Sequence, residues 1–209
     1  EIDFVGGYLS SQRVLFASAD RPWESLEEVL EYAEKNPGEV TVGSGGDPWT
    51  AGVLKAVGKK AGVEMNYITF EGGAAASSAA LGGHVDIVET GVGTPAWQAA
   101  KEGDLEILAV VSDGDLADYG MPEVENLKEK GYPFVTQGYT GMAVSSEVPE
   151  ARRQKLEDAL EYAITHPDVI EKFEANDLNP HFMTGAEYEK RAKEVIKEVK
   201  ELNEFLEEE

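Results

Sequence analysis

Short apolar runs alternate with longer stretches of helical periodicity over the first two thirds of the chain. The apolar runs predict strands over residues 14–17, 40–42, 66–70, 85–88 and 105–111. Between them the pattern predicts helices over residues 21–33, 50–61, 74–81 and 95–101. Helices that separate successive strands indicate βαβ units and a mainly parallel sheet. We therefore expect one α/β lobe over residues 12–135.

After this lobe the pattern changes from alternation to an extended run followed by helices. A short helix over residues 123–130 and an extended run over 134–146 precede three predicted helices, over residues 149–165, 167–176 and 186–206. The last helix is amphipathic, with Val195, Val199 and Leu202 on one side. The pattern thus predicts a compact α/β unit, a crossover and a helical tail.

Three of the predicted strands end in small residues just before a helix begins. This geometry points backbone N–H groups at an anion, and open α/β sheets bind ligands at the carboxyl ends of their strands. We therefore expect the three turns to form one site for a small carboxylate-bearing molecule. The residues expected to line it are Ser44, Gly45, Gly46, Asp47, Thr50, Gly72, Gly73, Ala74, Thr90, Gly91 and Thr94.

Several side chains near these turns have more than one interpretation. Ser44 is a ligand-binding hydroxyl, a turn residue that caps the next helix, or a nucleophile, although Val42 stands where a nucleophile elbow needs glycine. Glu89 faces the expected site and is suited to accept a hydrogen bond from a ligand amine or hydroxyl. Trp49 and Trp97 either cover an apolar part of the ligand or belong to the core.

Buried Asp86 is expected to serve as a partner for a neighbouring backbone turn. No Lys or Arg lies within the three turns, so the expected site has almost no fixed positive charge.

The charge and the cysteine count exclude several classes of function. The chain has 18 Lys and Arg against 41 Asp and Glu, a net charge of −23, so a nucleic-acid surface is not expected. The acidity fits either a solvated surface or adaptation to high salt. There is no cysteine, and no histidine and carboxylate occur at the spacing of metal ligands. We therefore expect no disulfide, no thiolate nucleophile, no metal and no cofactor.

With these residues in hand, the chain resembles the receptor family of tripartite tricarboxylate transporters, the TctC or Bug-type solute-binding proteins. The resemblance runs from about Val14 to the end of the chain. It rests on the order and spacing of several segments, at residues 70–74, 80–86, 101–105 before 108–110, 120–124 before 130–131, and 183–188. It implies a type II periplasmic-binding-protein fold with two lobes that close on an organic acid. It also implies no catalysis, and hence no catalytic residue.

The resemblance also implies a division of the chain between these lobes. Residues 12–135 correspond to the second, ligand-binding lobe, while 1–11 and 136–209 correspond to crossover strands and C-terminal helices of an incomplete first lobe that lacks its sheet. Tyr139, on the crossover, is expected to help close the site. The tail is expected to pack on a missing segment, on a second copy of the chain (self-association) or on swapped elements, because several apolar side chains would otherwise lack a partner: Ile164, Val169, Ile170, Phe173, Val195, Val199 and Leu202.

The expected function is that of an extracytoplasmic receptor that captures an organic acid and delivers it to membrane permease subunits. Glu71 places a negative charge beside the second turn, so a mono- or dicarboxylate is expected rather than a tricarboxylate. Two alternatives stay open: a ligand-sensing effector domain of the same fold, and a serine hydrolase that uses Ser44.

Overall fold

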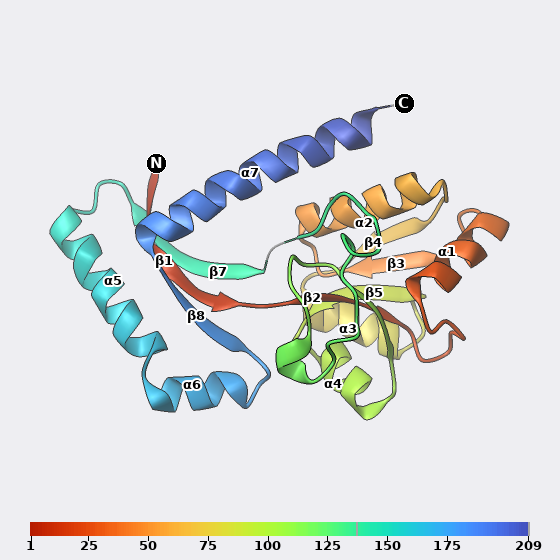
Figure 1. The fold of residues 1–209 in the computed structure, drawn as a ribbon, viewed down its shortest axis with the longest axis horizontal. Coiled ribbons are helices and arrows are strands. Elements are labelled where there is room, and N and C mark those ends of the chain that lie inside the picture. Colours follow the sequence, from red (N-terminus) through yellow and green to blue (C-terminus); the bar gives the residue numbers. More distant parts are fainter. Residues whose placement is uncertain (137, 209) are drawn as a thin grey trace. The chain divides into compact units, whose positions relative to one another are not determined.

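The computed structural model describes residues 1–136 and 138–208. The chain forms two compact units (Figure 1). The smaller unit contains residues 1–11 and 138–198, and the larger one contains residues 12–137 and 199–209.

The larger unit is built on a five-stranded sheet in the order β4-β3-β5-β2-β6. Its strands are β2 (Arg13–Ala17), β3 (Thr41–Ser44), β4 (Asn66–Thr69), β5 (Ile87–Gly91) and β6 (Glu106–Val110). β3 pairs in parallel with β4 and β5, whereas β2 is antiparallel to both β5 and β6. Four strands therefore run in one direction and β2 alone runs against them, which confirms the expected α/β class with a parallel-rich sheet.

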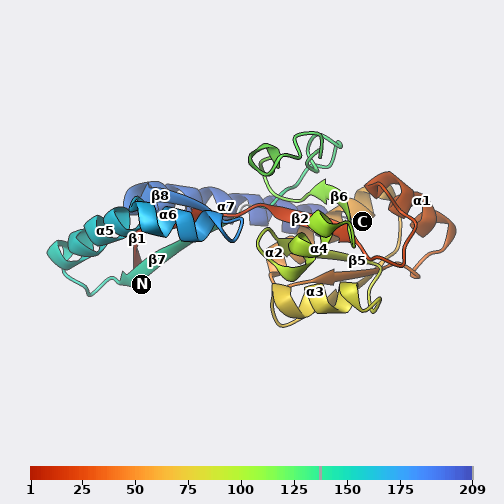
Figure 2. The same ribbon diagram turned by 90° about the horizontal axis from the view of Figure 1, so that it is seen from below.

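Helices cover both faces of this sheet. One core packs α1 (Leu26–Lys35) and α2 (Pro48–Ala61) against side chains such as Leu15, Val42 and Ile87. The other packs α3 (Gly73–Leu81) and α4 (Pro95–Glu102) against Phe16 and Val88. Figure 2 shows α3 lying along one face of the sheet. The two cores hold the strand ends, and the turns that follow them, in fixed positions.

Asp86 fastens β3 to the start of β5. Its carboxylate accepts hydrogen bonds from the backbone N–H and the hydroxyl of Thr41, both at 2.6 Å, and forms an ion pair with Arg21. The Asp86 N–H donates in turn to the Thr41 hydroxyl at 2.9 Å. The expectation that Asp86 is a buried partner for backbone groups is confirmed.

The helix predicted over residues 123–130 is wrong. The backbone there forms turns, because its polar groups bond to strand β6 instead of closing helical turns: Val110 N–H donates to Glu125 O, and Leu127 N–H donates to Val110 O. The preceding loop holds one short 3₁₀ helix, η1 (Ala117–Tyr119).

The smaller unit contains a three-stranded antiparallel sheet in the order β7-β1-β8. The strands are β1 (Ile2–Ser10), β7 (Tyr139–Ser145) and β8 (Asn179–Thr184), with α5 (Glu150–Ile164) and α6 (Pro167–Glu174) between the last two. Helix α7 (Gly185–Glu207) begins here, and its last residues belong to the larger unit. The three helices follow the sequence prediction, but β8 was missed, because a short edge strand that contains proline gives little apolar alternation.

Few apolar side chains of the smaller unit are buried. Among its described residues only Val5 and Ile164 are, whereas Tyr162 is 72% exposed and Ile196 is 56% exposed. The expectation that Ile164 and Leu202 lack a partner is wrong, because both are buried, Leu202 within the core of the larger unit. The other five side chains that were expected to lack a partner are half-buried: Val169, Ile170, Phe173, Val195 and Val199.

This contrast predicts different local stabilities for the two units. Amides of β1, β7 and β8 should exchange with deuterium at least about tenfold faster than those of β2, β3 and β5, because local opening exposes little apolar surface in the smaller unit. Hydrogen exchange followed by mass spectrometry measures this. Equal protection of β1 and β5 in dilute protein would contradict the prediction, and protection of β1 that grows with protein concentration would indicate a second copy on this unit.

Candidate functional site

The turns after β3, β4 and β5 meet at one end of the sheet of the larger unit. They meet because the three strands are parallel and adjacent, so their carboxyl ends coincide. A Cβ atom placed on Gly45 would lie 3.0 Å from the backbone nitrogen of Gly73, and one on Gly73 would lie 3.4 Å from the Thr94 methyl group. A side chain at Gly45 would therefore require the backbone of the second turn to move away by a few tenths of an ångström.

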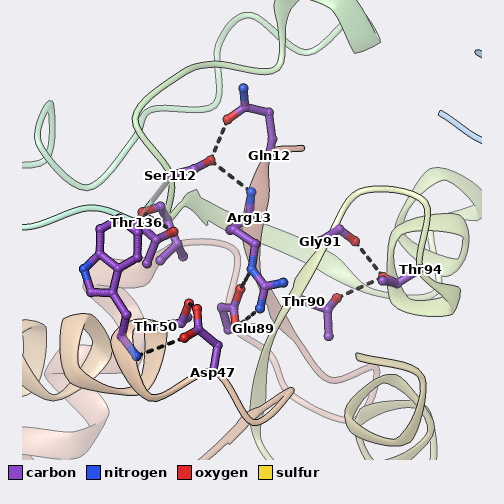
Figure 3. Close-up of polar contacts among 12 residues, drawn as sticks. Gln12, Arg13, Asp47, Thr50, Glu89, Thr90, Gly91, Thr94, Ser112 and Thr136 are labelled. Atoms are coloured by element: carbon purple, nitrogen blue, oxygen red, sulfur yellow. Dashed lines mark hydrogen bonds and ion pairs between the residues drawn. The ribbon is translucent and has the colours of Figure 1, made fainter. Parts of the chain in front are cut away.

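The first turn carries its own capping carboxylate. Asp47 is the N-cap residue of α2, and it accepts hydrogen bonds from Trp49 N–H at 3.1 Å and from the Thr50 hydroxyl at 2.8 Å (Figure 3). Thr50 is fully buried beneath it. Asp47 therefore occupies the place where we expected α2 to receive a ligand anion, and Asp47, not Ser44, caps this helix.

The third turn is also capped. Thr94 is the N-cap residue of α4; its hydroxyl lies 3.5 Å from Trp97 N–H and donates to Gly91 O at 2.7 Å. The hydroxyl of fully buried Thr90 lies 3.0 Å from that of Thr94 (Figure 3). Thr90 thus holds Thr94, and Thr94 is the half-exposed member of the pair.

The second turn differs, because α3 has no side-chain cap. Its N-cap residue is Gly72, with φ at 92°, and no side chain of the described residues bonds to the first-turn N–H groups. The first-turn residues Gly73, Ala74 and Ala75 are half-buried or exposed. Of the three helix starts, α3 alone lacks a side-chain cap, so its first-turn N–H groups meet no competing side-chain acceptor among the described residues.

Ser44 and Thr90 point to opposite faces of the sheet. Ser44 is paired with Glu89 in the parallel register of β3 and β5, so these two side chains share a face, and Thr90, the next residue along β5, faces the other way. Ser44 is 4% exposed, and its hydroxyl has no hydrogen-bond partner in the described structure.

An ion pair that the sequence did not reveal lies beside Ser44. Arg13 donates from Nε to Glu89 Oε1 at 2.5 Å and from Nη2 to Glu89 Oε2 at 2.8 Å (Figure 3). Glu89 is fully buried, and the Arg13 side chain is 25% exposed. The expectation of almost no fixed positive charge is therefore wrong, because Arg13 supplies one from β2. Both carboxylate oxygens of Glu89 already accept hydrogen bonds from Arg13, so Glu89 is not simply available to accept from a ligand.

Burial raises the pKa of Glu89, the charge and hydrogen bonds of Arg13 oppose this shift, and the negative charge of Asp47 adds to it. The sequence gives only a weak signal for this ion pair: Arg13 begins one buried strand, and the acidic residue Glu89 lies near the end of another.

A cluster of polar side chains just after the end of β6 holds the backbone of Arg13. Arg13 N–H donates to the Ser112 hydroxyl at 2.9 Å, and that hydroxyl donates to Gln12 Oε1 at 2.5 Å (Figure 3). Buried Thr136 donates to Val111 O at 3.4 Å. These bonds position the backbone of Arg13, so its side chain reaches Glu89.

Three aromatic residues are the remaining candidates. Trp97 is fully buried, with its ring 5.2 Å from that of Tyr119, so it belongs to the core. Trp49 is half-buried against the other core. Tyr139 lies on β7 of the smaller unit, with the guanidinium of Arg191 5.6 Å from its ring centre. Its expected role in closing the site stays a prediction.

A cavity of about 440 Å³ lies elsewhere in the larger unit, beside β6. Glu24, Glu106, Glu123 and Glu125 line it together with Lys130. An excess of carboxylates makes it unsuited to an organic anion. No group of three or more metal-binding side chains occurs in residues 1–136 and 138–208.

Comparison with known proteins places the chain among transport receptors. The model of a family described as tripartite tricarboxylate transporter family receptor matches residues 3–207. A Cupriavidus necator protein, described as a UPF0065 protein in the gbd 5′ region, is 31% identical over 194 residues, which are 92% of this chain and 58% of that protein. A Bordetella pertussis UPF0065 protein is 26% identical over 80% of this chain and 51% of its own length. The chain therefore spans little more than half the length of these relatives.

Solved structures share the fold. A TctC solute-binding protein from Polaromonas is 24% identical, with a TM-score of 0.72 over 98% of this chain and 69% of that one. MatC from Rhodopseudomonas palustris with bound malate is 22% identical, with a TM-score of 0.76 over 99% and 70%. An R. palustris protein with adipate is 14% identical, with a TM-score of 0.81 over 99% and 69%. The expected periplasmic-binding-protein fold is confirmed. In the part of the chain that the structure describes, no helix has both the length and the apolar character to cross a bilayer.

The buried ion pair predicts an asymmetric response to mutation. Arg13→Gln should lower the free energy of unfolding by about 3–5 kcal/mol, because it leaves a buried carboxylate without its cation. Glu89→Gln should cost less, because Arg13 is partly exposed and can be hydrated. Urea unfolding of both variants and of the double variant measures this, and the double variant should recover much of the loss.

The loss in Arg13→Gln should also depend on pH. The pKa of Glu89 is already raised by burial, and removing Arg13 raises it further. Protonation at low pH then neutralises the buried group, so the loss should be small in acid and should grow as the pH rises through that pKa. Equal losses for Arg13→Gln and Glu89→Gln at every pH would contradict this account.

Proposed function

The chain belongs to the tripartite tricarboxylate transporter receptor family, and we propose that it captures a small organic acid outside the cytoplasm and delivers it to the membrane permease subunits of such a transporter. The family and the fold are those of solute-binding proteins, not enzymes. The serine hydrolase alternative is therefore set aside, and Ser44 is assigned to binding. The malate and adipate held by proteins of the same fold support a carboxylate ligand.

The uncapped start of α3 carries the proposal. A ligand carboxylate there would accept hydrogen bonds from the N–H groups of the first turn, with Gly72, Gly73 and Ala74 forming its floor. Gly45 lets the first turn close over this point. Charge-assisted hydrogen bonds to backbone N–H groups are short and strong, so one such contact can fix the position of the ligand.

The other expected site residues have supporting roles in this proposal. Thr94 lies beside Gly73, and Thr90 and Gly91 hold Thr94 in place. The hydrogen bond between Asp47 and Thr50 holds the first turn in place, and Gly46 provides the left-handed backbone conformation that this turn needs. Gly46 has φ at 88°, and a Cβ there would lie 2.8 Å from Phe70 O. Ser44 and Tyr139 would contact the ligand body or close over it.

Charge limits the ligand to one or two carboxylates. Asp47 and Glu71 are exposed near the turns, and the charge of Arg13 is compensated by Glu89. A third ligand carboxylate would meet these negative charges without a cation, and like charges within about 4–6 Å disfavour binding.

The smaller unit is proposed to complete the receptor together with further polypeptide. Its few buried apolar side chains support contact with a second copy of the chain or with more of the same protein. Residues 1–11 and 136–209 would then be the crossover strands and C-terminal helices of a first lobe, and 12–135 the second lobe.

A competing carboxylate at α3 tests the proposed function. Ala75→Asp places an acidic side chain at the third position of an uncapped helix, where it can bond to the same N–H groups and stabilise the helix. We expect it to weaken binding of malate, succinate or adipate at least about tenfold, or 1.4 kcal/mol, without loss of thermal stability.

The matched control is Ser78→Asp, which adds the same charge at an exposed position one turn later. Isothermal titration calorimetry compares the two variants, with citrate as the tricarboxylate. If Ala75→Asp binds the acids as tightly as Ser78→Asp, the carboxylate site is elsewhere. If citrate binds best without added metal, the charge argument is wrong.

A further inference from the structure

The outer edge of β6 is only partly covered. β6 is the last strand of the five-stranded sheet, and β2 is its neighbour on the inner side. At the carboxyl end of β6 the chain itself lies along the free edge: Val110 N–H donates to Glu125 O, and Leu127 N–H donates to Val110 O. In the part of the chain that the structure describes, no such backbone bond reaches residues 106–108 from the outer side. The amino half of this edge is therefore open.

The cavity of about 440 Å³ beside β6 follows this open edge. Residues 106–108 line it together with Met121 and Val124, two half-buried apolar side chains from the loop after β6. A second cavity, of about 220 Å³, continues the first, because four residues line both: Glu24, Gly103, Leu105 and Glu106. We call the two cavities together the β6 groove.

The β6 groove has an excess of negative charge. Three of its carboxylates, at Glu24, Glu106 and Glu123, are exposed, and none of them forms an ion pair with another described residue. The ammonium group of Lys130 is already paired with two other carboxylates, at 3.2 and 3.6 Å. The guanidinium of Arg21 is paired as well. A positively charged group is therefore attracted to the groove, because a cleft lined by one sign of charge concentrates its field.

The same charges decide which chain can pair with the open edge. An open strand edge is a template for pairing with another chain, and charged side chains on it prevent unwanted pairing. A second copy of this chain, with a net charge of −23, would add negative charge to the groove. A basic segment would instead neutralise it. An extended segment also presents alternate side chains to one face, so it can offer basic and apolar side chains in turn.

We propose that the β6 groove is a docking site for an extended segment of a partner protein, in which Lys or Arg alternates with apolar residues. The segment adds a strand to β6 at residues 106–108, and backbone hydrogen bonds supply much of its affinity. Its basic side chains pair with Glu106 and Glu123, and its apolar side chains contact Met121 and Val124. None of the residues that line the groove belongs to the turns after β3, β4 and β5, so the inference does not depend on the proposed ligand.

A fluorescein-labelled peptide, Lys-Val-Lys-Ile-Lys-Val, is the probe for this site. Fluorescence polarisation in dilute buffer should show saturable binding, which weakens at least about tenfold in molar salt, because the exposed charges are then screened. The same peptide with all its backbone amides N-methylated keeps its charge but cannot add a strand, so it should bind at least about tenfold more weakly. The double variant Glu106→Gln/Glu123→Gln should weaken binding of the unmodified peptide about fivefold.

The matched control is Glu31→Gln/Glu34→Gln, which removes two exposed charges from α1 outside the groove and should leave peptide binding unchanged. Both double variants should keep the melting temperature of the parent. Failure of the probe to bind would overturn the proposal, and so would equal binding by the N-methylated peptide or equal weakening by the two double variants. A dimer of the protein that Met121→Asp dissociates would also overturn it, because a second copy would then occupy the groove.

Discussion

Helix N-termini need acceptors for their first N–H groups, and this need organises the candidate site. Three helices start at the same end of one sheet, because β3, β4 and β5 are parallel and adjacent. Asp47 caps α2 and Thr94 caps α4, while α3 begins at Gly72 without any side-chain cap. Because two of the three starts carry a side-chain cap, the start of α3 is the one where an external carboxylate would meet no competing side-chain acceptor.

The ion pair of Arg13 and Glu89 makes this arrangement compatible with an anion. An unpaired buried carboxylate beside the turns would repel the ligand and destabilise the sheet. Arg13 comes from β2, which runs against its neighbours, so its side chain reaches the end of β5 from the opposite direction. The antiparallel strand thus brings a cation to a place where no residue of the three turns can supply one.

The strands of the larger unit, most of the helices and the convergence of the turns were predictable, because each depends on local periodicity, glycine and proline positions and the rules of parallel sheets. The role of Asp86 was predictable from its place beside a buried strand. The Arg13–Glu89 pair was not, because 76 residues separate its partners and the register of β2 against β5 is set by tertiary packing. The same limit explains residues 125–127, which bond to β6 against their helical pattern, and the capping role of Asp47, which sequence could not distinguish from ligand binding.

Backbone NMR during titration with a dicarboxylate tests the central claim most directly. If the start of α3 binds the carboxylate, the amide signals of Gly73, Ala74 and Ala75 should show the largest downfield proton shifts. The amides of Trp49 and Trp97, which are bonded to Asp47 and Thr94, should change little. Large shifts at Trp49 or Trp97 with unchanged signals at Gly73–Ala75 would show that the ligand displaces a cap instead, and would contradict the account.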